Sequence, residues 1–263
     1  MKKTIYIFLL AFAVQISAKA QEAPAVVEET VEVTKQAGDE AYSQERYQEA
    51  IDIYEELLST GDATLELHYN LGNAYFRNNM IGNAILNYEK ALKIDPTDDA
   101  AKFNLEFAQN RIKDEIPQAD KVLFIEWGES FVNMFSINTW AAIAVSAFII
   151  MLIAALMFIF GKSSTMRRSG LIVAICSLVA TVLSNISAYN IYGVMNDNSN
   201  AIVMKEEVSV KSSPDSSGTV LIKIHEGRKV KILDDTIKDW VEVEVDNGKL
   251  IVGWVPAQTI ERI

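Results

Sequence analysis

The sequence predicts a multidomain membrane protein with three folded parts: an all-α helical-repeat domain, a transmembrane α-hairpin and a small all-β barrel. Residues 31–98 predict the first part, because glycine, alanine and tyrosine recur there with a period of 34 residues. Two uncharged apolar runs, 139–160 and 170–192, are each long enough to cross a bilayer. After Lys205 the apolar residues alternate with polar ones, as they do in β-strands.

The charge of the chain is segregated along its length. The 263 residues carry a net charge of −11, yet half of them are hydrophobic and the mean hydropathy is +0.12. Residues 21–135 hold most of the excess negative charge, and the two apolar runs hold none. Nucleic acid is excluded as a partner because no basic patch is present, and the single cysteine, Cys176, excludes a disulfide framework.

Residues 1–20 have the pattern of a secretory signal peptide. Two lysines precede the apolar stretch 5–16, and Ala18 and Ala20 form a small-residue cleavage box before Gln21. An uncleaved anchor is the alternative, but an apolar stretch of 12 residues is short for a bilayer. We therefore expect the leader to be cleaved and the segment that follows to be exported.

Residues 31–117 are expected to form the repeat domain, with two repeats and a capping helix over 99–115. The residues that recur are Gly38 and Gly72, Ala50 and Ala84, and Tyr54 and Tyr88. Together with Leu71-Gly-Asn-Ala-Tyr75 and Asp95-Pro96 in the second copy, this pattern resembles the tetratricopeptide repeat, a helix–turn–helix unit. The first copy departs from the pattern, since Ala41 stands at the position of Tyr75 and Leu57 at that of Ala91.

The resemblance implies a partner groove on the first helix of each repeat. Its candidate residues are Lys35, Tyr42, Tyr69, Asn73, Phe76 and Phe103. Asp39 stands where binding of chaperone carboxyl termini would need an asparagine, so such binding is not predicted. The aromatic residues of this set are equally consistent with the core of the repeats. The acidic domain is expected to prefer neutral or basic partners.

Residues 118–138 predict an interfacial linker helix that rests on the bilayer, and the transmembrane helices 139–160 and 170–192 follow. The loop between them, 161–169, contains Lys162, Arg167 and Arg168, and short basic loops stay in the cytoplasm. Both flanking domains then face the periplasm of a bacterial inner membrane, in agreement with the leader. Ser177, Thr181, Ser184 and Ala188 form a small, weakly polar stripe beside Asn185. We interpret that stripe as packing against the first span, with another membrane protein as the alternative.

Residues 203–263 predict short strands joined by turns, including a hairpin turn at Asp246-Asn-Gly248. The Val-Lys-Ser-Ser-Pro opening and Gly253-Trp-Val255 resemble a bacterial SH3-like barrel. The resemblance implies binding of peptidoglycan or peptides, with Trp240 as the candidate on the ligand face. His225 is expected to face solvent, and no metal site or cofactor is predicted.

No catalytic motif is present in the sequence, so we predict that the protein is not an enzyme. A redox role for Cys176 is disfavoured because it lies within a span. The order of modules resembles the Bat proteins of Bacteroides-type aerotolerance operons, of the BatE type. That resemblance implies a membrane scaffold that works with other Bat-type membrane proteins in oxidative-stress tolerance or envelope maintenance. The alternative is a cell-wall sensor that binds peptidoglycan through the barrel.

Overall fold

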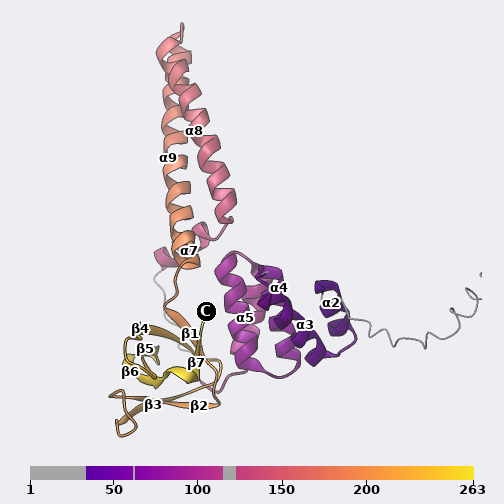
Figure 1. Cartoon of the computed structure of the whole chain (residues 1–263). Helices are drawn as coiled ribbons and strands as arrows, with labels where there is room; N and C mark the ends of the chain where they lie inside the picture. Colours follow the sequence, from indigo (N-terminus) through magenta and orange to yellow (C-terminus); the bar gives the residue numbers. More distant parts are fainter. Residues whose placement is uncertain (1–33, 62, 115–122) are drawn as a thin grey trace, which may run out of the picture. The chain divides into compact units, whose positions relative to one another are not determined.

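The computed structural model describes residues 34–61, 63–114 and 123–263, and contains helices followed by a single antiparallel sheet (Figure 1). The predicted leader, 1–20, lies outside the described residues. The fold class expected from the sequence is confirmed: a tetratricopeptide-like helical region, two apolar helices and a C-terminal SH3-like sheet.

The described residues of the repeat region form five consecutive helices. They are α2 (Lys35–Ser43), α3 (Tyr47–Ser59), α4 (Leu65–Arg77), α5 (Ile81–Ile94) and α6 (Asp99–Gln109). Thr34, Thr64 and Asp98 cap the N-termini of α2, α4 and α6, since each side chain accepts a hydrogen bond from a first-turn amide. The capping helix ends at Gln109, before the expected position 115.

The core of the repeat region is formed by small residues and tyrosines at equivalent positions of the two copies. Ala50 and Ala84 are fully buried, and Tyr54 and Tyr88 are almost so. The turns inside the repeats also match, because Glu45 and Asn79, 34 residues apart, both have a φ of 61°. Two segments with the same spacing therefore fold into the same helix–turn–helix unit.

Three further helices follow: α7 (Leu123–Val132), α8 (Ile137–Phe160) and α9 (Ser164–Met195). Helices α8 and α9 are long and apolar enough to cross a membrane, and only 17% and 11% of their most apolar windows are buried in the protein. The connection between them is shorter than expected from the sequence, because α9 begins at Ser164 within the predicted loop 161–169. A helical start at Ser164 is favoured because the preceding Ser163 accepts a hydrogen bond from the Met166 amide.

Helices α8 and α9 lie side by side (Figure 1) and approach closely at small residues. A Cβ added at Gly170 would come within 2.8 Å of backbone atoms of Ala154 and Phe158. Ala147, Ser184 and Ser187 are buried in the same contact. The small stripe predicted on the second span therefore packs against the first span.

The C-terminal part contains seven strands in the order β3-β2-β6-β5-β4-β1-β7. Their bounds are β1 (Asn200–Val203), β2 (Glu207–Lys211), β3 (Val220–His225), β4 (Lys229–Asp234), β5 (Trp240–Asp246), β6 (Leu250–Pro256) and β7 (Ile260–Arg262). Strand β5 alternates strictly, with Val241, Val243 and Val245 buried. The hairpin of β5 and β6 pairs Asp246 with Leu250, so the turn predicted at 246–248 lies where expected.

Candidate functional site: an aromatic groove in the repeat domain

A cavity of about 240 Å³ opens on the first helices of the repeats. It is lined by Tyr42 of α2, by Asn73, Phe76 and Arg77 of α4, by Tyr88 of α5, and by Phe103, Asn104 and Phe107 of α6. We call these eight residues the aromatic groove. Its walls are apolar side chains that stay open to solvent, since Phe103 is 68% and Phe107 is 51% exposed. Exposed aromatic residues around a concavity are typical of a binding surface.

The local sequence explains why the groove has this floor. A Cβ at Gly72 would come within 2.7 Å of the Tyr88 ring, so only glycine lets α4 and α5 approach at this point. Tyr88 of α5 therefore lies against α4, where its hydroxyl donates a hydrogen bond to Asn73 Oδ1 over 2.8 Å. Burial and the nearby Tyr69 raise the pKa of Tyr88, so its hydroxyl stays protonated and remains a donor.

Two asparagines supply the polar part of the groove. Asn104 Nδ2 donates to Asn73 Oδ1 over 2.8 Å and to the Tyr69 hydroxyl over 3.1 Å. Within the described residues, no partner reaches the amide nitrogen of Asn73 or the amide oxygen of Asn104. One free donor and one free acceptor match the N–H and C=O groups of an extended peptide backbone.

Two guanidinium groups make the groove locally basic. Arg77 lies over the Tyr47 ring at 4.7 Å, and Arg111 lies over the Phe76 ring at 5.4 Å. No acidic residue is among the eight that line the groove. The groove therefore differs in charge from the acidic domain around it, because the domain's carboxylates lie elsewhere.

The structure brings together four of the six groove residues named from the sequence: Tyr42, Asn73, Phe76 and Phe103. Lys35 lies outside the cavity and forms ion pairs with Asp39 at 2.8 Å and Glu66 at 2.9 Å. Tyr69 also lies outside the cavity lining and packs on Tyr88, with ring centroids 6.2 Å apart.

Sequence reasoning missed four members of the groove: Arg77, Tyr88, Asn104 and Phe107. Helix α6 was treated as a cap, whereas it occupies the place of the first helix of a third, incomplete repeat. Extending the period of 34 by one step maps Asn70 onto Asn104 and Asn73 onto Phe107. That extension would have found Phe107, whereas Asn70 is not a groove residue and gives no such signal for Asn104.

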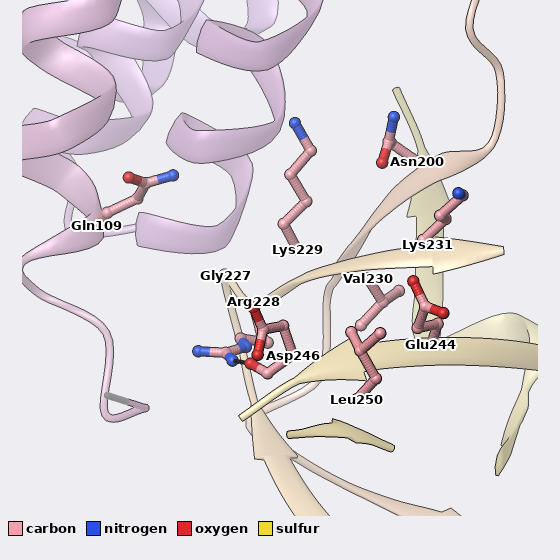
Figure 2. Close-up of a pocket in the computed structure, with 10 residues that line it drawn as sticks. All are labelled: Gln109, Asn200, Gly227, Arg228, Lys229, Val230, Lys231, Glu244, Asp246 and Leu250. Carbon is pink, nitrogen blue, oxygen red and sulfur yellow. Dashed lines mark hydrogen bonds between the residues drawn. The ribbon is translucent and has the colours of Figure 1, made fainter. Parts of the chain in front are cut away.

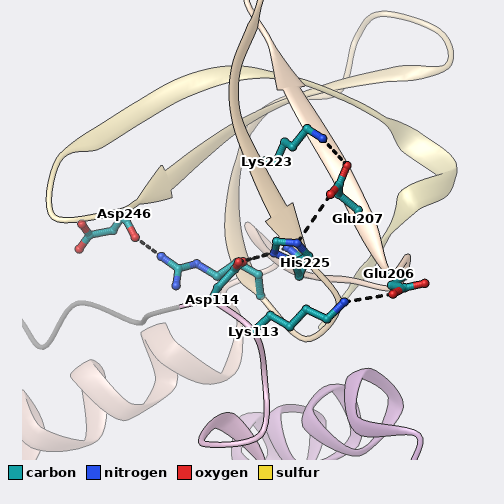
Figure 3. A network of polar contacts seen from close by, with 8 residues as sticks. Lys113, Asp114, Glu206, Glu207, Lys223, His225 and Asp246 are labelled. Atoms are coloured by element: carbon teal, nitrogen blue, oxygen red, sulfur yellow. Dashed lines mark hydrogen bonds and ion pairs between the residues drawn. The ribbon is translucent and has the colours of Figure 1, made fainter.

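The SH3-like domain contacts the repeat domain through a set of polar residues (Figure 3). His225 Nδ1 lies 2.6 Å from Asp114 Oδ1, and the His225 amide donates to Asp114 Oδ2 over 2.9 Å. Lys113 pairs with Glu206 at 3.0 Å in the same region. The expectation that His225 faces solvent is wrong, because the carboxylate of Asp114, 111 residues earlier, covers its ring.

The contact between the two domains also has a buried part. Glu226 Oε1 accepts from the Gly82 amide over 3.0 Å, so a side chain of the SH3-like domain caps the N-terminus of α5. Ile202 of β1 is fully buried and belongs to the core of the repeat helices. These two contacts make the barrel part of the same compact unit as the repeats.

A second cavity, of about 270 Å³, lies between Gln109 of α6 and the barrel (Figure 2). Two of its basic residues, Lys229 and Arg228, have partners within the protein. Lys229 pairs with Glu89 at 2.7 Å, Arg228 donates to the Asp246 carbonyl, and Lys231 stands opposite Glu244 in the sheet. We therefore interpret this cavity as part of the polar interface between the two domains rather than as a binding site.

Trp240, the candidate ligand residue of the barrel, begins strand β5 and is half-buried. Lys211 Nζ lies 5.7 Å from the centre of its ring, in a cation–π arrangement. Within the part of the chain that the structure describes, no group of three histidine, cysteine or acidic residues has the geometry of a metal site. Cys176 lies on α9, with its side chain exposed outward from the protein.

Two family models match the chain. The tetratricopeptide repeat model matches residues 65–98, and the bacterial SH3 domain model matches residues 206–261. A search of the curated proteins found no match. The matched modules are interaction domains: tetratricopeptide repeats suggest a protein partner, and bacterial SH3 domains suggest cell-wall binding.

Proposed function

We propose that this protein is a membrane-anchored periplasmic scaffold whose aromatic groove binds an extended segment of a partner protein. The observation that carries the proposal is the groove itself, where exposed Phe103 and Phe107 flank an asparagine pair with a free donor and a free acceptor. The aromatic side chains would hold apolar side chains of the segment, and the asparagines would hold its backbone.

The charge of the groove indicates the chemistry of the partner segment. Arg77 is the charged residue of the cavity lining, and Arg111 stacks on its edge at Phe76. We therefore propose a segment with apolar side chains and a carboxylate. The charge of the whole domain favours neutral or basic partners, but short-range contacts with Arg77 decide specificity inside the groove.

Site-specific photocrosslinking in the full chain tests the groove. A photoreactive residue at Phe103 should give a partner adduct, whereas one at Ile94, the exposed last residue of α5, should give none. Arg77→Glu should reduce the Phe103 adduct about tenfold by repelling the carboxylate. Equal adducts at Phe103 and Ile94, or an Arg77→Glu variant without effect, would contradict the groove proposal.

The membrane anchor is proposed from helices α8 and α9, which have the length and composition of spans. Trp140 near the start of α8 is held by a bond from its indole nitrogen to the Val132 carbonyl at 2.9 Å, as expected at a membrane interface. At the other end, Arg167 Nε donates to the Gly161 carbonyl over 3.0 Å and stabilises the C-terminus of α8. The repeat and SH3-like domains, which contact each other, lie on one side, and the basic loop lies on the other.

Cysteine labelling tests this topology in a Cys176→Ser background. Ser164→Cys, at the first residue of α9 beside the basic residues Lys162 and Arg167, should resist a membrane-impermeant reagent in intact spheroplasts. Ser216→Cys, in an exposed turn of the barrel, should be labelled. Labelling of both sites, or protection of both, would contradict the proposed orientation.

The second candidate function is binding of peptidoglycan by the SH3-like domain. It is favoured by the match to the bacterial SH3 domain and by Trp240, which is partly open to solvent beside Lys211. The full chain in detergent should then sediment with purified sacculi, and Trp240→Ala should release it. An isolated fragment is a poor probe, because Ile202 would lose its place in the helical core.

The resemblance to Bat aerotolerance proteins suggests the biological setting of this scaffold. We propose that its partner is another membrane protein of the Bat type and that the complex acts in oxidative-stress tolerance or envelope maintenance. The support is the order of modules in the sequence. A deletion strain complemented with the Arg77→Glu chain should show the same sensitivity to oxygen as the deletion itself, and full complementation would contradict this role.

A further inference from the structure

Helix α9 carries a second regular stripe besides the one that packs against α8. Its members follow the four–three spacing of a heptad: Leu171, Ile175, Leu178, Val182, Asn185, Tyr189 and Tyr192. All seven are exposed, and the six apolar or aromatic members are 43–77% exposed. The residues that face α8, among them Gly170 and Ser184, are buried. We call the seven residues the outer face of α9.

Asn185 is the one amide on the outer face and lies well inside the proposed span. It precedes Tyr192 by seven residues, which places it about 10 Å from that end of the span. Its Nδ2 donates to the Thr181 carbonyl over 2.8 Å. Within the described residues, neither its second amide hydrogen nor its Oδ1 has a partner. An amide with unsatisfied polar atoms against hydrocarbon is costly, so a partner from outside this chain would stabilise it.

The other polar residues of α9 do not share this combination of depth and exposure. Thr181 donates its hydroxyl to the Ser177 carbonyl at 2.9 Å and is half-buried, and Ser184 is buried against α8. Asn190 also donates to its own helix, at the Ile186 carbonyl, but lies two residues from Tyr192 at the aqueous end. Asn185 is therefore the position on this helix where an external hydrogen-bonding partner has the largest effect.

We propose that the outer face of α9 pairs with the same face of a second copy of this chain. This inference rests on the membrane anchor described under the proposed function. Two copies insert with the same orientation, so their α9 helices are parallel and each residue lies at the same depth as its counterpart. Asn185 then meets Asn185 without any further requirement, and an amide is self-complementary because it both donates and accepts. A different protein would need a hydrogen-bonding side chain of its own at that depth.

The heptad spacing supports the same occupant. A sustained spacing of 3.5 residues keeps one face in contact along a left-handed pair, and a single Asn in such a face sets the register. Pairing of α9 would place two repeat domains, and hence two aromatic grooves, on one dimer. Binding of a partner that is itself oligomeric would then gain from multivalency.

Disulfide crosslinking of the full chain in bacterial membranes tests the pairing. Val182→Cys in a Cys176→Ser background should give a dimer under mild oxidation. The native Cys176 is a matched control, because it lies nine residues from Asn185 and therefore about 180° around the helix. Adding Asn185→Leu should lower the dimer fraction about tenfold at low expression, whereas Asn185→Gln should retain it.

The outcomes separate this inference from the proposed anchor. An unchanged dimer fraction in the Asn185→Leu chain, or equal crosslinking through Cys176, overturns the pairing. A crosslink from Val182→Cys to a different protein overturns the second copy as occupant. If the chain is retained in the carbonate-resistant membrane fraction without a dimer, only the pairing fails. If the chain is absent from that fraction, the anchor and the pairing fail together.

Discussion

The two repeats of the helical domain have the same architecture but different chemistry at equivalent positions. In the first, the Tyr54 hydroxyl donates to the carboxylate of Asp39 at 2.7 Å; in the second, the Tyr88 hydroxyl donates to the amide of Asn73 at 2.8 Å. The donor, its distance and the neighbouring glycine are shared, and only the acceptor differs. Asp39 is satisfied by Lys35, Tyr54 and Asn70, whereas Asn73 keeps a free donor beside the groove.

This difference indicates which of the two repeats has hydrogen-bonding capacity left for a ligand. A carboxylate surrounded by three donors within its own domain has little capacity left for a ligand. An amide whose oxygen is occupied still offers its nitrogen to a ligand. Apart from Tyr42, which lines the groove, the first repeat therefore supports the fold, and the second supplies the floor of the groove.

The largest expected effect comes from removing either tyrosine ring. Tyr54→Ala and Tyr88→Ala should each lower the free energy of unfolding by about 3–5 kcal/mol, because both rings are almost fully buried. Thermal unfolding of the full chain in detergent, followed by circular dichroism, measures both. Phe103 photocrosslinking should fall with Tyr88→Ala, while Tyr54→Ala at a temperature where it is folded should retain it. Equal loss in both would contradict the division of roles.

The next effect comes from adding a methyl group at the paired glycines. Gly38→Ala and Gly72→Ala should each cost about 1–3 kcal/mol by overpacking, since the new Cβ would lie 2.3 Å and 2.7 Å from a tyrosine ring atom. The same unfolding measurement applies. Gly128→Ala is a control, because nothing lies within 4 Å of its added Cβ. A cost at Gly72 no larger than that at Gly128 would show that the helices can separate freely.

A smaller effect should distinguish the two acceptors. Tyr54→Phe should cost about 1.5 kcal/mol because a bond to a charged acceptor is lost, and Tyr88→Phe about 1 kcal/mol. Asp39 is partly exposed, so solvent screening keeps the first value near the lower end for charged bonds. Both variants remove only the tyrosine hydroxyl, so each serves as the control for the other. A larger loss of stability in Tyr88→Phe than in Tyr54→Phe would contradict the stronger hydrogen bond expected for the charged acceptor, Asp39.

The smallest expected effect is a dependence on acid. Burial raises the pKa of Asp39, but the hydrogen bonds from Lys35 and Tyr54 outweigh it, so the net pKa lies below 3.8. The stabilisation is therefore fully present above the unfolded value and is lost as the pH falls through the folded value. Asp39→Asn introduces the amide found in the second repeat. This variant should be less stable than the unchanged chain near neutral pH, and its free energy of unfolding should change less as the pH falls below ~4. Unfolding midpoints between neutral and acidic pH check this, and parallel curves for both chains would contradict it.

Much of the helical domain could be predicted from local patterns. The period of 34 correctly paired Gly38 with Gly72 and Tyr54 with Tyr88, because each repeat uses the same close approach of two helices. The family model matches the second copy, 65–98, and the first copy folds alike despite Ala41 and Leu57. Burial of Ala41 shows that a smaller side chain is accepted where Tyr75 fills the space in the second copy.

The groove was only partly predictable, and the domain contact was not. Tyr42, Asn73, Phe76 and Phe103 follow from the repeat pattern, but on α6 the pattern was applied to Phe103 alone and not to Asn104 and Phe107. Asp114 and His225 are polar residues of ordinary appearance in the sequence. Their pairing across 111 residues depends on how the repeat domain and the SH3-like domain pack against each other.

The sequence by itself determined the modules, because helical repeats, apolar spans and alternating strands can each be recognised from the local spacing of apolar residues along the chain. It also determined the basic loop and the polar Asn185 within an apolar helix. Only the tertiary structure decided which face of α9 is left open, which residues share the groove, and that Glu226 caps α5. The physical reason is that spacing constrains neighbours along the chain, whereas contacts between distant segments depend on the packing of complete surfaces.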